Sequence, residues 1–389
     1  MKEYHTPFKA ARGYVSAMTT AQLSVKREAA ATVGKNSGNR AVSLWLWFVA
    51  LLVFAMVVVG GATRLTESGL SITEWQPLLG AFPPLTETDW MTAFEKYKLI
   101  PQYTALNHGM SLEEFKFIYW WEWSHRLLGR LIGVVFALPL VFFWWTGRLD
   151  RGTGMKFLGI LALGALQGAI GWYMVKSGLS DRIEVSQYRL ALHLTTAFMI
   201  LGLLVWLALD EWPAEPYVTG EIATPLIKRM ASIIVAAVLV QVVLGAFVAG
   251  LRAGLIYNTW PTMDGQWFPS DYWINPAYLS FFEGHAAAQF NHRVVAYIVT
   301  ALVLVQVWLT YRTPVDDRIR LSALWLGGAV ILQAVLGIAT LLSHVPLHLG
   351  LLHQAGGAVV LTAAVVHLYA TRRAGIVPRD FSSRGRASA

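Results

Sequence analysis

The chain has 389 residues, of which 56% are hydrophobic and only 14% charged, and it contains no cysteine. A soluble domain of this length would need far more charge to cover its surface, and the missing cysteines exclude disulfides and thiolate ligands. The net charge of +8 does not indicate nucleic acid, because the basic residues gather in the tails and in alternate loops, which is a membrane topology signal.

A transmembrane helix needs roughly 20 mostly apolar residues. Residues 1–42 are polar, and we expect a flexible cytoplasmic tail there. After it we predict an N-terminal four-helix bundle over 43–208, a cytoplasmic linker over 209–228, a C-terminal four-helix bundle over 229–370 and a second cytoplasmic tail over 371–389. The eight apolar stretches behind this division are 43–63, 125–146, 156–175, 188–208, 229–250, 292–311, 321–342 and 350–370.

The second half of the chain repeats the first. Gly60 to Trp75 reads GGATRLTESGLSITEW, and Gly245 to Trp260 reads GAFVAGLRAGLIYNTW. The third and seventh helices also share a Leu-Gln dipeptide followed by a glycine at the same spacing. Because each copy holds an even number of helices, both copies enter the membrane in the same orientation. We predict an all-α integral membrane protein whose eight transmembrane helices form two pseudo-symmetric four-helix bundles, a parallel repeat.

Four histidines occupy matching places in the two copies. His125 and His292 begin the second and sixth helices, and His193 and His353 lie in the fourth and eighth. Two imidazoles on facing helices at one depth can supply both axial ligands of a haem iron, although any one of them could instead make an interhelical hydrogen bond. His367 lies too far inside to join them, and we expect a structural role. Secondary candidates for the second site are His285, His344 and His348.

A haem also needs cations for its propionates, and guanidinium groups pair well with carboxylates. Snorkelling to lipid headgroups is the alternative for such residues. The outer loops are poor in basic residues, so we expect the few arginines there to have assigned partners. The candidates are Arg64, Arg126, Arg130, Arg252 and Arg293.

The copies differ beside the first histidine of each. Glu122 precedes His125 by three residues, and Gln289 has the same place before His292. A carboxylate beside a haem edge can take a proton or stabilise positive charge, whereas Gln cannot do so in the same way. We therefore assign chemistry to the first half and binding to the second. The structural alternative is that Glu122 only accepts a hydrogen bond from a nearby Arg or Trp.

The run GGATRLTESGLSITEWQPLLGAFPP, the segment EFKFIYWWEWSHRLLGR and the placed histidines resemble the haem A synthase family, in its proteobacterial and mitochondrial form, over about 43–370. The resemblance implies oxidation of a methyl group of haem O to the formyl group of haem A. It makes His125 and His193 ligands of the substrate haem, and His292 and His353 ligands of a haem b cofactor. Glu122 matches the family's essential glutamate. A Bacillus-type branch carries a cysteine pair in its outer loop, which this chain lacks.

The same resemblance implies haem O as substrate and a multi-pass protein of the cell inner membrane, surrounded by lipid. The excess of basic residues in the tails and in alternate loops indicates that both termini are cytoplasmic. A mitochondrial inner membrane is the alternative. Pathway logic adds haem O synthase as an expected partner, and a homo-oligomer stays open. The mechanism of the oxidation also stays open between two routes. One is stepwise removal of electrons followed by addition of water, and the other is reaction with dioxygen at an iron that has lost one histidine ligand. A non-enzymatic di-haem b cytochrome oxidising quinol is the main alternative function. A transporter is disfavoured, because transporters usually place ionisable groups near the bilayer midplane.

Overall fold

A computed structural model describes residues 39–74, 79–178, 185–213 and 223–373. Within these ranges the chain has no strand, and eight helices are long and apolar enough to cross a membrane. The chain is thus a multi-pass membrane protein, and the all-α prediction is confirmed. The eight helices are α2 Arg40–Leu65, α5 Leu112–Trp145, α6 Arg151–Gly178, α7 Gln187–Glu211, α8 Pro225–Gly250, α10 His285–Arg312, α11 Asp317–Leu342 and α12 Leu347–Arg373. Nearly all of the two predicted tails, and part of the predicted linker, lie outside the described residues.

The start of α5 differs from its prediction. Ser111 caps the helix: its hydroxyl accepts a hydrogen bond from the Glu114 amide at 3.3 Å, and the Glu114 carboxylate accepts one from the Ser111 amide at 2.8 Å. This reciprocal cap starts the helix at Leu112, well before the apolar stretch begins. His125 therefore lies deep within α5, and the expectation that it begins the helix was wrong. His292 was also expected to begin its helix, but α10 already starts at His285.

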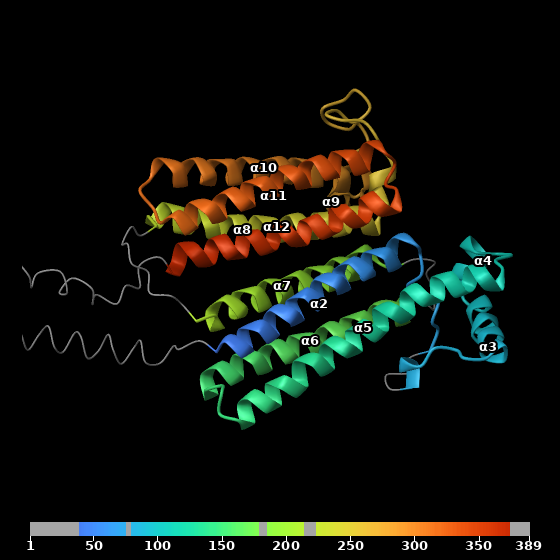
Figure 1. The fold of residues 1–389 in the computed structure, drawn as a ribbon. Helices are drawn as coiled ribbons and strands as arrows, with labels where there is room; N and C mark the ends of the chain where they lie inside the picture. The colour runs from blue at the N-terminus through green and yellow to red at the C-terminus, as the bar shows by residue number, and fades with distance from the viewer. Residues whose placement is uncertain (1–38, 75–78, 179–184, 214–222, 374–389) are drawn as a thin grey trace, which may run out of the picture.

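The long helices form two groups of four (Figure 1). In the first group α2 packs on α5, α5 on α6, α6 on α7 and α7 on α2, so α5 and α7 stand diagonally. In the second group α8, α10, α11 and α12 follow the same cyclic order, which places α10 and α12 diagonally. The groups join through α2, α7, α8 and α12. This order is the one a tandem repeat would give, and a symmetry axis along the membrane normal stays a prediction.

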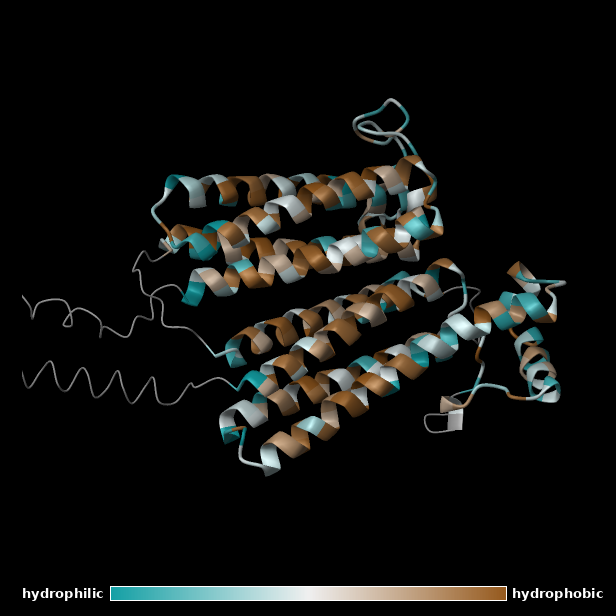
Figure 2. Cartoon of the chain, in the orientation of Figure 1, coloured by the Kyte–Doolittle hydropathy of each residue, from teal (hydrophilic) through white to brown (hydrophobic). Residues whose placement is uncertain are grey.

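The surface of the two groups suits lipid rather than water. Figure 2 shows hydrophobic residues along the middles of the helices and hydrophilic residues mainly towards their ends. Large apolar side chains point outwards, among them Leu138 and Trp325, which are 67% and 71% exposed. In a bilayer such exposure costs nothing, because lipid tails are as apolar as the side chains.

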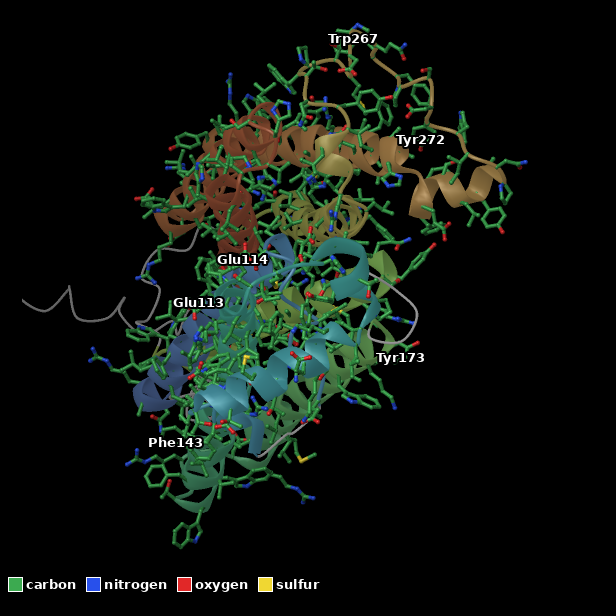
Figure 3. All side chains as sticks on the ribbon, turned by 90° about the vertical axis from the view of Figure 1, so that its right-hand side faces the viewer. Glu113, Glu114, Phe143, Tyr173, Trp267 and Tyr272 are labelled. Atoms are coloured by element: carbon green, nitrogen blue, oxygen red, sulfur yellow. The ribbon has the colours of Figure 1, made fainter. Side chains whose placement is uncertain are left out.

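The two ends of the described chain lie at one end of the molecule. Arg373 pairs with Asp210, and the Tyr369 hydroxyl donates to the Leu209 carbonyl at 2.9 Å, so the end of α12 meets the end of α7. The Ser43 hydroxyl donates to the Ala208 carbonyl and brings the start of α2 there as well. The long loops occupy the opposite end, which Figure 3 views directly. We call this opposite end the histidine end.

The loop after α2 is itself folded at the histidine end. The Phe94 ring of α3 stacks on the Phe115 ring in the extended start of α5, with the ring centroids 4.9 Å apart, and Tyr103 of α4 packs on Phe94 and Tyr97 of α3. The Gln102 amide accepts from the Tyr97 hydroxyl at 3.1 Å and donates to the Glu67 carbonyl at 3.0 Å, which ties the loop to α2. The short elements here and in the later loop are η1 Leu79–Ala81, α3 Glu87–Lys98, α4 Pro101–Leu106, η2 Ala253–Leu255, η3 Ala277–Leu279 and α9 Ser280–Glu283.

His367 is fully buried far from the histidine end. Gln306 Nε2 lies 2.8 Å from one of its ring nitrogens, and the Ser322 hydroxyl lies 2.9 Å from the other. Gln306 also donates to the Ile227 carbonyl at 3.1 Å, so the imidazole joins α8, α10, α11 and α12. These contacts occupy both ring nitrogens and favour the structural role expected from the sequence.

We expect His367→Leu to destabilise the protein without emptying a haem site. It removes one hydrogen-bonding partner from Gln306 Nε2 and one from the Ser322 hydroxyl, while both groups keep their bonds to the Ile227 and Ile319 carbonyls. We therefore expect a loss of about 1–3 kcal/mol in total. The melting temperature in detergent should fall, while haem bound per folded molecule stays constant. Loss of haem at an unchanged melting temperature would contradict the structural role.

Candidate functional site

His292 and His353 face each other across the diagonal between α10 and α12. Their ring centroids are 6.3 Å apart, and the ring planes are inclined by 80°. A metal bound to one nitrogen of each ring at about 2.0 Å would hold the two ring centres roughly 6 Å apart. The described geometry therefore suits an iron between the two rings with little movement of either helix. The three secondary candidates are close in sequence to His292 or His353, and their side chains are exposed: His285, His344 and His348.

Each imidazole of this pair lies against a glycine on a neighbouring helix. A Cβ at Gly245 of α8 would lie 3.1 Å from Cε1 of His292, and a Cβ at Gly337 of α11 would lie 2.8 Å from Cε1 of His353. The second contact is closer than real Cβ atoms approach, and the first is tighter than most of them. The glycines thus make the room that the two rings occupy inside the group.

The first group repeats this packing. A Cβ at Gly60 of α2 would lie 2.9 Å from Cε1 of His125, and a Cβ at Gly171 of α6 would lie 3.0 Å from Cε1 of His193. Within the described residues, Nδ1 of each of these two histidines is buried and has no hydrogen-bond partner. Buried ring nitrogens without partners are rare in proteins, and they fit rings whose final position depends on a ligand.

The glycine contact can be tested with a matched pair of variants on α11. We expect Gly337→Ala to displace His353 and to reduce haem bound in the second group severalfold, because the new methyl group overlaps the ring. Gly328→Ala is the control, since a Cβ there meets nothing within 4 Å. The measurement is haem per purified protein. Equal haem contents in the two variants would contradict the contact.

A glutamine side chain contacts each histidine of the second group. Of these two glutamines, only Gln333 was noted in the sequence, as part of the repeated Leu-Gln dipeptide. Gln333 Nε2 donates to the His353 carbonyl at 2.8 Å and lies 3.1 Å from its Nδ1. Gln241 Nε2 donates to the His292 carbonyl at 3.0 Å and lies 3.0 Å from its Nδ1. In the second group, each imidazole therefore contacts a glutamine side chain and packs against a glycine that leaves space for the ring.

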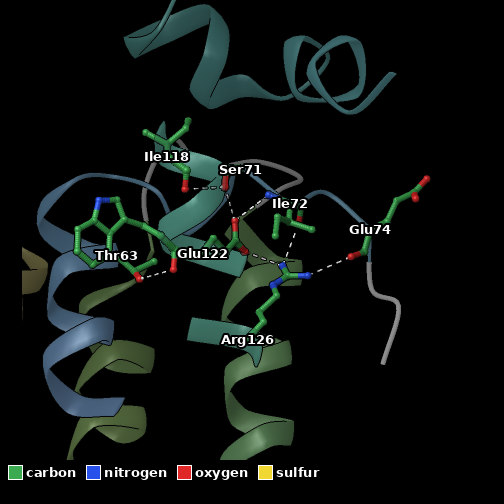
Figure 4. Close-up of polar contacts among 8 residues, drawn as sticks. Thr63, Ser71, Ile72, Glu74, Ile118, Glu122 and Arg126 are labelled. Atoms are coloured by element: carbon green, nitrogen blue, oxygen red, sulfur yellow. Dashed lines mark hydrogen bonds and ion pairs between the residues drawn. The ribbon is translucent and has the colours of Figure 1, made fainter. Parts of the chain in front are cut away.

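Glu122 is buried at the loop-side end of the first group (Figure 4), with 2% of its surface exposed. One carboxylate oxygen accepts from the Ser71 hydroxyl at 2.8 Å and from the Ile72 amide at 2.7 Å. The other accepts from Arg126 Nη2 at 2.6 Å, which completes an ion pair within α5. Glu122 therefore binds the segment after α2 to α5, one helical turn from His125.

Arg293 makes the corresponding clamp in the second group. It donates to the Tyr257 carbonyl and to the Thr259 carbonyl, both at 2.9 Å, and Gln289 Nε2 also donates to the Tyr257 carbonyl at 3.0 Å. Arg126 donates at matching positions of the first loop, to the carbonyls of residues 72 and 74. Each arginine thus fastens a loop to the helix that carries the first histidine of its pair, and the contact of both arginines with haem propionates stays a prediction.

Two more of the predicted arginines, Arg64 and Arg252, make contacts between the two groups of helices. Arg64 Nη2 donates to the Ala249 carbonyl at 3.2 Å and to the Gly250 carbonyl at 3.4 Å, at the C-terminal end of α8. Arg252 forms an ion pair with Glu67 at 2.6 Å. A cation at a helix C-terminus is stabilised by the helix dipole. These contacts fasten α2 to α8 at the histidine end. Arg130 is half-buried on α5, one turn inside Arg126.

The fold and the site together define a class: a polytopic helical membrane protein with histidine pairs gathered towards one end. The sequence pattern of the COX15-CtaA family, described as cytochrome oxidase assembly protein, matches residues 43–365 and so includes all four paired histidines and Glu122. The chain belongs to this family.

Curated relatives span almost the same length. A protein named Heme A synthase from Beijerinckia indica subsp. indica is 54% identical over 336 residues, which cover 86% of this chain and 93% of the relative. A protein of the same name from Parvibaculum lavamentivorans is 50% identical over 335 residues, 86% of this chain and 95% of the relative. Another from Mesorhizobium japonicum is 51% identical over 349 residues, 89% of this chain and 95% of the relative.

Proposed function

We propose that this chain is a haem A synthase, which oxidises a methyl group of haem O to the formyl group of haem A for cytochrome oxidase. The observation that carries the proposal is the family match over 43–365, which takes in both histidine pairs and joins the chain to relatives named for this activity. The site supports it independently, because two paired sites allow one haem to be substrate and the other cofactor.

In this proposal the two groups hold different haems. His125 and His193 hold haem O as substrate, and His292 and His353 hold haem b. The glycines beside all four rings, the 6.3 Å ring separation of the second pair and the partnerless nitrogens of the first pair support axial ligation. A haem b in the second group would supply a one-electron carrier. Arg126 and Arg293 fasten the neighbouring loops to the helices that carry His125 and His292.

Glu122 is the proposed catalytic group. Conversion of a methyl group to a formyl group is a four-electron oxidation. With water as the oxygen source it releases four protons and passes four electrons to an external acceptor; with dioxygen as the oxidant it consumes one O2 and releases one water. In the first route a proton acceptor beside the substrate accelerates the reaction. Glu122 lies one turn of α5 from His125 and is the buried carboxylate at that position. Its bonds to Ser71 and Arg126 fix its position before substrate arrives. Gln289 has no charge to offer at the matching place, which assigns the chemistry to the first group.

The proposal also places the protein. We infer the cell inner membrane, with both chain termini cytoplasmic and the histidine end on the opposite side. The meeting of α2, α7 and α12 at one end supports common sidedness of the termini. Because haem O synthase makes the proposed substrate, we propose that enzyme as a partner.

The deciding experiment is haem extraction, chromatography and mass detection on the protein expressed in a host that makes haem O but no haem A. Haem A together with haem b is the expected result. Haem b alone, at two per chain and reducible by quinol, would replace the proposal with an electron-transferring di-haem cytochrome.

A further inference from the structure

The two histidine pairs differ in what supports their imidazoles. In the second group Gln241 and Gln333 each approach Nδ1 of their histidine, at 3.0 and 3.1 Å. In the first group the position that matches Gln241 in the repeat is Met56, whose side chain has no amide group. Gln167 matches Gln333, but it donates only to the His193 carbonyl, at 2.9 Å.

One glycine explains why Gln333 approaches a ring nitrogen of its histidine whereas Gln167 does not. The Gln333 amide oxygen lies where a Cβ at Gly356 of α12 would be only 2.1 Å away, so the amide occupies space that any other residue would fill. The matching position of α7, three residues after His193, is Thr196. A threonine there excludes the amide from the equivalent place, which leaves Gln167 on the backbone.

Support at Nδ1 matters for metal binding. A histidine that binds a metal through one ring nitrogen almost always has its other nitrogen hydrogen-bonded, and this bond fixes the ring and makes it a better ligand. Oε1 of Gln241 and of Gln333 accepts no hydrogen bond within the described residues. In the described position the amide nitrogen, a donor, lies beside Nδ1 and also bonds the histidine carbonyl. A rotation of the amide by about 180° exchanges its nitrogen and oxygen and brings the oxygen to the Nδ1–H that an imidazole bound to a metal through its other nitrogen carries, in place of the bond to the carbonyl.

We propose that Gln241 and Gln333 are positioning residues that make the second group a permanent haem site, whereas Met56 and Thr196 leave the first group a site from which haem exchanges. The inference rests on the proposed function, since a cofactor must stay while substrate and product must come and go. It assigns this difference to the neighbours of the ligands, because the four ligands are all histidines.

The test compares haem loss from purified holoprotein to excess apomyoglobin. Gln241→Met copies the first group and nearly keeps the side-chain volume; we expect haem b to leave about 10–100-fold faster, the usual effect of losing such a partner. Met56→Gln makes the reverse change and should slow release of the first-group haem. Gly356→Ala should speed haem b loss by displacing the Gln333 amide, although it removes no polar group.

Gln306→Leu is the matched control, because it removes a buried glutamine that contacts His367 and no paired histidine. Its haem b loss should match wild type. A shift in the reduction potential of haem b in Gln241→Met is a second readout, which a general loss of stability would not produce. Unchanged haem b loss in both Gln241→Met and Gly356→Ala would overturn the inference. If wild type still makes haem A in that case, the proposed function survives it.

Discussion

Replacing Glu122 with Gln is expected to stop most haem A formation while both haem sites stay filled. Gln has nearly the shape of Glu, and Gln289 occupies the matching buried position in the second group while it still bonds the loop, so the fold should persist. The substitution removes only the negative charge and the proton acceptor. Since a general base typically contributes roughly 10²–10⁴-fold to a rate, we expect a fall of that size. Haem A formed per bound haem O, followed over time by chromatography, measures it.

Ser71→Ala provides the comparison for that variant. It removes one hydrogen bond to the carboxylate, of 2.8 Å, but leaves Glu122 and its ion pair with Arg126. We expect a much smaller fall in rate than for Glu122→Gln. A Glu122→Gln protein that binds both haems and forms haem A at the wild-type rate would end the catalytic assignment, and Glu122 would then only fasten the loop to α5.

Removal of single histidines is expected to empty one site at a time. His353→Ala should lose haem b and keep haem O, and His125→Ala should lose haem O and keep haem b, because each pair lies within its own group of helices. An unpaired axial position also changes the iron's spin state, so absorption and electron paramagnetic resonance spectra report which haem is affected. His348→Ala, an exposed histidine on the same helix as His353, should change neither.

Equal loss of both haems from either ligand variant would contradict separate sites. It would instead indicate that the two groups fold or load together, which the shared contacts among α2, α7, α8 and α12 would allow. The haem b content of His125→Ala is therefore the more informative measurement, since it changes a ligand in the group that does not bind haem b.

The sequence was sufficient for the eight spans and for the four histidines, because lipid imposes long apolar stretches and the repeat aligns polar exceptions within them. It failed at the start of α5, since hydropathy sees only the part of a helix that lies in lipid. The Ser111–Glu114 cap was the available signal. The helices α3 and α4 in the loop after α2 were not predicted from the sequence.

Partners of polar side chains were harder to predict than their positions. Gln241 stands in an apolar helix, and nothing in the sequence specifies that it approaches His292 from α8. The contact of Arg64 with a haem propionate stays a prediction, and the structure adds bonds from Arg64 to backbone carbonyls of α8 that the sequence did not indicate. A carbonyl is present at every residue and leaves no trace in a sequence, so such a contact requires the arrangement of the helices to be known first.

The fastening of α2 to α8 has a consequence for how such a protein can be assembled. Glu67 and Arg252 hold matching positions in the repeat, and they pair because one is acidic and the other basic. Two copies of the first half in this arrangement would set Glu67 against Glu67, and two copies of the second would set Arg252 against Arg252. Like charges at a two-fold contact repel, so either half disfavours its own homodimer. The diverged pair thus favours contact between unlike halves over contact between like halves.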